Sequence, residues 1–244
     1  MSDARRVLLV GATGHLGRAL AFALAARGDH LVLTARDPAR LQSLAADLTA
    51  PSSSTHPSPS APPPQVIPAD LRAPDAPARI ATAALATGDI DHLLLASGPF
   101  PRTPLADLDR DALLDALTVH AVAPLLLASA LSPALARRHG AIVALGDAGV
   151  ARPYPNHLAY ITAKGALDAG LRTLALELAP HVRVNLLSLG VVTDPEASRD
   201  PARFPRLAAR ATLGRFGTPA EVVHAALALL DATWTTGEVW GLGR

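Results

Sequence analysis

Short apolar runs alternate with longer segments of helical periodicity along most of the chain. The short runs predict buried strands, which we expect at Arg6–Val10, His30–Thr34, Gln65–Pro68, Asp91–Ala96, Ala141–Leu145, Val182–Leu187 and Glu238–Trp240. After a first helix that ends at Gly28, helices are expected at Pro38–Leu48, Asp75–Thr87, Ala112–Arg138 with a break or bend around Pro124, His157–Leu178 and Pro219–Asp231. This alternation is typical of the α/β class, and it predicts a doubly wound parallel sheet of about seven strands with helices on both faces.

Two segments interrupt this pattern. Residues 50–64 are rich in proline and serine and lack periodicity, which predicts a flexible surface loop. Residues 188–210 are irregular and punctuated by proline, and we expect them to form a lid over the substrate. No internal repeat divides the chain, so residues 1–244 are expected to form a single Rossmann-type domain.

Composition narrows the class of protein. The 244 residues are 50% hydrophobic and 18% charged, with a net charge of +1 and scattered arginines, which gives no basic patch for nucleic acid or membrane. Cysteine is absent, which excludes disulfides and a thiol nucleophile, and the nine histidines show no metal-ligand spacing. The N-terminus passes from charged residues directly into a strand, without a signal peptide. We therefore expect a soluble cytoplasmic protein that acts on a small molecule and uses no metal.

A glycine-rich turn follows the first predicted strand. Gly11, Gly14 and Gly17 recur every three residues between that strand and a helix. Such a turn brings backbone amides and the positive end of the helix against a pyrophosphate, so we assign it to a dinucleotide, together with its residues Thr13, His15 and Leu16. The alternative is a plain tight turn.

The end of the second strand bears on the choice of cofactor. An acidic residue at this place suits NAD, whereas the 2′-phosphate of NADP requires a cation. Ala35 is not acidic and Arg36 offers a planar fork suited to phosphate, so NADP(H) is favoured. The alternative is that Arg36 is merely solvated and that Asp37 caps the next helix.

Tyr160 and Lys164 stand four residues apart on one face of a predicted helix, and Lys164 is the only lysine of the chain. A nearby ammonium favours the phenolate and should lower the phenol pKa from its usual value of about 10. We therefore predict that Tyr160 is a general acid that protonates a carbonyl or imine as hydride arrives. The alternative is a surface pair that slightly stabilises the helix.

With the glycine turn, the TARD segment (Thr34–Asp37), the Tyr160/Lys164 pair and the ELAPHVRVN run (Glu177–Asn185), the chain resembles the short-chain dehydrogenase/reductase (SDR) family from about Arg6 to its end. The resemblance implies an NADP-dependent oxidoreductase that forms a homotetramer or homodimer through the helices Ala112–Arg138 and His157–Leu178. It also places further residues beside the cofactor, with the adenine near Asp70 and Leu71, the ribose and nicotinamide near Ser97 and Gly98, and the carboxamide near Gly190 and Val192. Lys164 would bind the ribose as well as activate Tyr160.

Two positions depart from the common pattern of that family. Asp147 stands where most members have a catalytic serine, and His120 stands where most have the asparagine of a proton relay. With Asp147 and Phe100, the chain looks like the pteridine reductase branch, in which an aspartate bonds or protonates the pterin and an aromatic ring stacks on it. Asp147 and Phe100 are accordingly assigned to the substrate, and Asp147 to catalysis with Tyr160 and Lys164. The alternative for Asp147 is a turn residue that bonds its own backbone.

These observations predict an NADPH-dependent reductase acting on a carbonyl or imine compound, with a pteridine as the narrower expectation. Two other functions stay open. A general carbonyl reductase would use the same residues. A catalytically weak NADP-sensing regulator would keep the fold without turnover, as the substitutions at His120 and Asp147 would allow.

Overall fold

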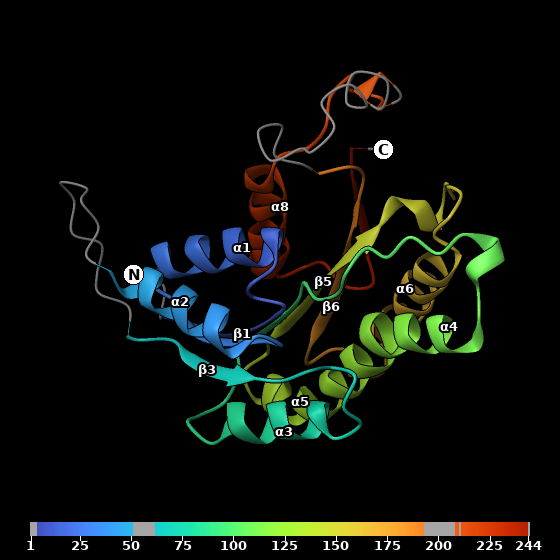
Figure 1. Ribbon diagram of the computed structural model, residues 1–244. Helices are drawn as coiled ribbons and strands as arrows, with labels where there is room; N and C mark the ends of the chain where they lie inside the picture. The colour runs from blue at the N-terminus through green and yellow to red at the C-terminus, as the bar shows by residue number, and fades with distance from the viewer. Residues whose placement is uncertain (1–3, 51–61, 193–207, 210, 244) are drawn as a thin grey trace.

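Seven parallel strands form one sheet at the centre of the molecule (Figure 1). The computed structural model describes residues 4–50, 62–192, 208–209 and 211–243. The sheet order is β3-β2-β1-β4-β5-β6-β7, and every neighbouring pair is parallel. The strands are β1 Arg6–Val10, β2 His30–Ala35, β3 Gln65–Pro68, β4 His92–Leu95, β5 Ala141–Asp147, β6 Arg183–Leu189 and β7 Val239–Leu242. The predicted doubly wound parallel sheet is confirmed.

Helices cover both faces of the sheet, and each face has its own apolar core. On one face lie α1 (His15–Ala26), α2 (Pro38–Thr49) and α8 (Pro219–Asp231), and on the other lie α3 (Ala76–Leu85), α4 (Arg110–Leu117), α5 (Ala123–Arg137) and α6 (Leu158–Leu178) (Figure 1). Successive strand residues point to opposite faces, so β1 supplies Leu8 to one core and Leu9 to the other. Strands that are buried on both sides account for the nearly continuous apolar runs in the sequence.

The long helix predicted at Ala112–Arg138 is interrupted before Pro124 rather than at it. A π-helical turn, Thr118–Val122, separates α4 from α5, and Pro124 lies in the first turn of α5. The Ala123 amide donates to the Thr118 carbonyl across this turn, whereas Pro124 has no amide proton to donate. The turn carries His120 into the interior, where 2% of its surface is exposed.

The Arg110–Arg137 segment is apolar and long enough to cross a membrane by composition alone. However, 44% of its most apolar window is buried inside the protein. Leu127, Leu131 and Leu135 of α5 belong to the core on the sheet. This is the arrangement of a core helix.

The carboxyl ends of the strands position the functional residues. The chain order reverses between β1 and β4, which are neighbours in the sheet, and ligands of open α/β sheets bind at such a reversal. The strand predicted to end at Leu145 continues to Asp147, because Gly146 and Asp147 pair with Ser188 and Leu189 of β6. The predicted loop 50–64 and lid 188–210 lie mostly outside the described residues.

Candidate active site

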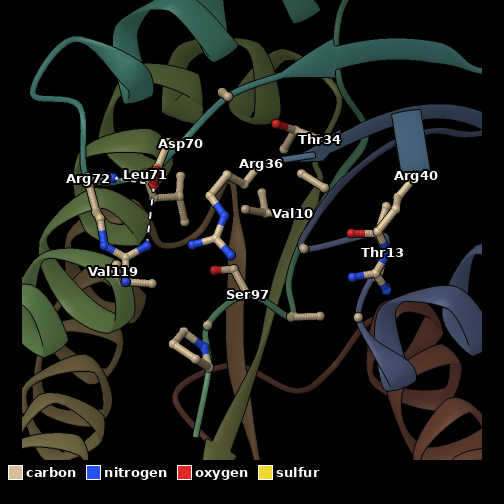
Figure 2. A pocket seen from close by; sticks show the side chains of 17 residues that line it. Val10, Thr13, Thr34, Arg36, Arg40, Asp70, Leu71, Arg72, Ser97 and Val119 are labelled. Carbon is tan, nitrogen blue, oxygen red and sulfur yellow. Dashed lines mark hydrogen bonds and ion pairs between the residues drawn. The ribbon is translucent and has the colours of Figure 1, made fainter. Parts of the chain in front are cut away.

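A cavity of about 290 Å³ opens where β1, β2 and β4 end (Figure 2). The glycine turn, the residues after β2 and β3, and the loop after β4 line it. Of the residues that the sequence assigned to the cofactor, the lining includes Gly11, Thr13, Arg36, Asp70, Leu71, Ser97 and Gly98. The sheet thus brings together residues from four separate parts of the chain at the predicted place.

The glycine turn packs directly on the loop after β4. The Gly11 amide donates to the Thr34 carbonyl at 2.9 Å, and the backbone of Gly11 has φ +85°. A Cβ there would lie 2.6 Å from Ser97 Cα, and a Cβ on Gly17 would lie 2.1 Å from the Gly11 carbonyl oxygen. Side chains are excluded at both positions, which leaves the backbone and the start of α1 to face the cavity.

Two arginines follow β2, with Arg36 directly after the strand and Arg40 in the first turn of α2. Figure 2 shows the Arg36 side chain reaching into the cavity, with Arg40 beside Thr13 at its edge. Arg40 Nη2 donates to the Thr13 carbonyl at 2.9 Å, whereas no hydrogen bond or ion pair holds Arg36 to any other described residue. Asp37 caps α2 by accepting from the Arg40 amide at 3.1 Å, as the alternative interpretation held. Sequence reasoning missed Arg40, although one turn of the capped helix brings position 40 back toward the glycine turn.

Asp70 and Leu71 line the cavity opposite the glycine turn (Figure 2). Arg72, which the sequence reasoning also missed, lines it too and pairs with Asp70 at 3.5 Å. The same guanidinium binds both carboxylate oxygens of Asp115 on α4, at 2.5 and 2.9 Å. This two-pronged ion pair ties the loop after β3 to α4.

His120 occupies the space behind Gly98. A Cβ on Gly98, where φ is +117°, would lie 2.0 Å from the imidazole Cε1. Neither ring nitrogen makes a hydrogen bond of normal geometry within the described part of the chain. Burial, followed by the charge of Lys164, lowers the pKa of His120 to about 3, an effect that the Pro99 carbonyl partly offsets. The ring is therefore neutral. It lies perpendicular to the Tyr160 ring, with 5.1 Å between the two ring centroids.

Tyr160 and Lys164 are both buried on α6, with 7% and 6% of their surface exposed. The Lys164 ammonium donates to the Leu145 carbonyl at 2.7 Å and lies 5.8 Å from the Tyr160 ring centroid. The two residues are thus an interior pair, and the alternative of an exposed surface pair is wrong. Burial lowers the pKa of Lys164 to about 8, against a smaller opposing effect of Asp147.

The prediction that Lys164 lowers the pKa of Tyr160 is wrong for the protein without cofactor. Burial raises that pKa, and the Asp147 carboxylate raises it further through its charge and its hydrogen bond with the hydroxyl. Removing the proton would place a second negative charge beside Asp147 in a water-poor site. The phenol therefore keeps its proton.

The Asp147 carboxylate accepts hydrogen bonds from three groups. Its Oδ2 accepts from the Tyr160 hydroxyl at 3.0 Å, and the Tyr154 hydroxyl lies 3.1 Å from each carboxylate oxygen. Oδ1 also accepts from the Gly149 amide at 2.7 Å, so Asp147 bonds its own turn as well as Tyr160. The interpretation of Asp147 as a turn residue that bonds its own backbone is confirmed, and its assignment to the substrate and to catalysis stays a prediction. Tyr154 carried no sequence signal beyond its place seven residues after Asp147.

An aromatic cluster packs beside the Tyr160 ring. Phe100 stacks on His157 with 4.2 Å between centroids and meets Tyr160 at 4.9 Å, nearly perpendicular. The His157 ring is fixed because its Nδ1 lies 2.8 Å from the Pro101 carbonyl, to which it donates. Phe100 keeps 58% of its surface exposed, so it can contact a bound molecule.

Other predicted residues lie outside the cavity. His15 is exposed at the start of α1, and Leu16 packs on the core of that face. Gly190 donates to the Leu242 carbonyl at 2.7 Å, while Val192 forms a bridge with Gly217. Gly190 thus lies directly after β6 and beside the end of β7, and Val192 lies beside the segment that precedes α8. Among the described residues, no group of three or more potential ligands could hold a metal ion.

Comparison with known proteins agrees with this arrangement. A family model described as enoyl-(acyl carrier protein) reductase matches residues 11–241. Human L-xylulose reductase is 30% identical over 241 residues, which are 96% of this chain and 92% of that protein.

Two solved structures share the fold. L-sorbose reductase from Gluconobacter frateurii, complexed with NADPH and L-sorbose, has a TM-score of 0.87 and 22% identity over 98% of this chain and 95% of that one. NAD⁺-bound xylitol dehydrogenase has a TM-score of 0.86 and 23% identity over the whole of both chains. The same fold therefore accommodates either nicotinamide cofactor. The chain belongs to the short-chain dehydrogenase/reductase family of oxidoreductases.

Proposed function

We propose that the protein is an NADPH-dependent reductase of carbonyl or imine compounds. The observation that carries this proposal is the buried Tyr160, whose hydroxyl donates to Asp147 at 3.0 Å beside the loop after β4 that lines the cavity. A phenol that keeps its proton can give it to a substrate oxygen or nitrogen, which is the role needed for reduction. A base for alcohol oxidation would instead have to lose that proton first.

The residues of the cavity fit a dinucleotide. The backbone of the glycine turn would hold the pyrophosphate, and Asp70 and Leu71 would lie by the adenine. Lys164 would bind the ribose and hold the reacting ring against Tyr160. When bound, the reduced nicotinamide supplies the hydride.

The preference for NADPH rests on the two cations at the end of β2. Arg36 has a side chain with no ion pair to a described residue and a direct route into the cavity. The nearest carboxylate along the chain, Asp37, is engaged in capping α2. A 2′-phosphate would satisfy Arg36, whereas a ribose hydroxyl would leave it without an anion.

The narrower proposal is a pteridine substrate. Phe100 offers an exposed aromatic surface next to Tyr160, and Asp147 offers a carboxylate that can bond ring nitrogens. A general carbonyl reductase is the competing assignment, and the relatives named L-xylulose reductase favour it.

Turnover separates these functions. Purified protein is given NADPH with dihydrobiopterin, dihydrofolate and a panel of simple ketones and sugars, and the loss of NADPH absorbance is followed. Consumption with a pterin supports the narrower proposal, and consumption with ketones alone supports a general carbonyl reductase. Tight NADPH binding without turnover of any compound would overturn the reductase and favour a cofactor-sensing regulator.

We also propose that the chain forms a homotetramer or homodimer through its α4–α6 helices. Large apolar side chains are exposed there, with Leu126 of α5 at 52% and Leu176 of α6 at 81%. Light scattering on the purified protein tests this, and a monomer at micromolar concentration would contradict it.

A further inference from the structure

The substrate side of the site carries a fixed negative charge. Asp147 accepts hydrogen bonds from Tyr160, Tyr154 and Gly149, so its carboxylate cannot turn away from the Tyr160 hydroxyl without losing them. No arginine pairs with it within the described ranges. The nearby cation is Lys164, which is buried and donates to the Leu145 carbonyl. The group beside the Tyr160 hydroxyl is therefore a carboxylate of fixed orientation.

Aromatic rings add to this negative character. Phe100, His157 and Tyr154 form a connected cluster with centroid distances of 4.2 to 6.1 Å, and Phe100 also contacts Tyr160. The faces of phenyl and phenol rings attract cations. A carboxylate combined with such rings is a recognition site for a positively charged, flat organic group.

Substrates differ in whether they need the Tyr160 proton. The Tyr160 hydroxyl donates to Asp147 at 3.0 Å, and reduction of a ketone requires that proton to move to the substrate oxygen. A substrate that already carries its proton or alkyl group on nitrogen needs no acid from the protein.

We infer that the preferred substrate is a cyclic iminium ion, a cationic C=N⁺ compound held by Asp147 and the aromatic cluster. This inference rests on the proposed reductase function and narrows its substrate class. Hydride adds to the iminium carbon while the C=N π pair becomes the nitrogen lone pair, so the product is a neutral amine. NADPH is oxidised to NADP⁺ in the same step, and no proton is transferred.

A pair of probes of similar shape tests the inference. N-methyl-dihydroisoquinolinium is a permanent cation, and tetralone is a neutral bicyclic ketone of about the same size. We expect the wild type to reduce the cation with a kcat/KM at least about tenfold higher, above an enzyme-free control, since a charge-assisted contact contributes roughly one to two powers of ten. In Asp147→Asn, which keeps an acceptor for the Gly149 amide, the ratio of kcat/KM for the cation to kcat/KM for tetralone should fall about 10- to 100-fold.

Binding gives a second readout that needs no cofactor. Calorimetric titration of the free protein with the cation should show saturable binding that Asp147→Asn weakens by about tenfold or more. Tyr154→Phe, which removes one donor to Asp147 without changing the backbone, should weaken it several-fold and serves if the first variant does not fold. Equal kcat/KM for both probes in the wild type, or an equal fall for both in Asp147→Asn, would overturn the inference. Saturable binding of the cation without turnover of any probe or carbonyl would support the cation site and overturn the reductase.

Discussion

The two halves of the site were formed by different physical means. On the cofactor side, strand order and glycine geometry bring backbone amides to the cavity, and few side chains decide the outcome. Around Tyr160, five polar and aromatic side chains from β5, α6 and the loops beside them set one another's orientation. A site built from the backbone can therefore be predicted from the local sequence. A network of side chains depends on distances in space, which the spacing along the sequence does not give.

The largest effect is expected where the two halves meet, at Lys164. Its pKa is lowered from 10.5 to about 8 in the folded protein, so the folded state binds fewer protons than the unfolded state between these values. The free energy of unfolding of the wild type should therefore rise with pH across this window, by about 3 kcal/mol, relative to Lys164→Met. Denaturant unfolding at a series of pH values measures this difference. The titration of the two tyrosines cancels in the difference because both proteins contain them. A difference that is flat or falls with pH would show that Lys164 is not desolvated.

Gly98 joins the halves through His120. Gly98→Ala adds a Cβ at 2.0 Å from the imidazole and forces an alanine to φ +117°, so we expect a loss of about 2 to 3 kcal/mol in unfolding free energy and weaker NADPH binding. Adding His120→Ala to Gly98→Ala should recover the part of the lost unfolding free energy that arises from the clash. The part that arises from backbone strain should stay lost. If the double variant is no more stable than Gly98→Ala, the ring and the loop are not in contact.

Arg36 tests whether the cofactor side selects between nicotinamide cofactors. Arg36→Ala should weaken NADPH binding about 10- to 100-fold and leave NADH within about threefold, because only NADPH carries the 2′-phosphate. Arg40→Ala is the matched control and should have the smaller effect, since Arg40 is already bonded to Thr13. Equal losses for the two cofactors in Arg36→Ala would contradict a phosphate contact.

The smallest effect is expected at Asp37, one residue along. Asp37→Ala removes the cap of α2 and should cost about 1 kcal/mol of unfolding free energy, with NADPH and NADH affinities unchanged. Thermal unfolding and cofactor titration on the same sample measure both quantities. A gain in NADPH affinity or a loss in NADH affinity would instead identify Asp37 as a ribose ligand.

The same contrast explains what could be predicted from the sequence. The strands and α8 lie within two residues of their predicted ends, because apolar runs and capping residues act locally. Gly11 and Arg36 lie at the cavity because parallel strands bring their carboxyl ends to one edge. Spacing placed Tyr160 and Lys164 on one helix face and missed the effect of burial and Asp147 on the Tyr160 pKa. It also missed Arg40 and Tyr154, whose partners are distant from them in the chain or lie across an irregular turn.

The most direct test of the proposed mechanism is to remove the Tyr160 hydroxyl. Tyr160→Phe keeps the ring that contacts Phe100 and His120 and loses only the proton and its bond to Asp147. Steady-state kinetics on the best carbonyl substrate, with NADPH affinity measured on the same protein, should show kcat lowered about 10²- to 10⁴-fold and cofactor affinity within about threefold of the wild type. An unchanged kcat would contradict the assignment of Tyr160 as the proton donor.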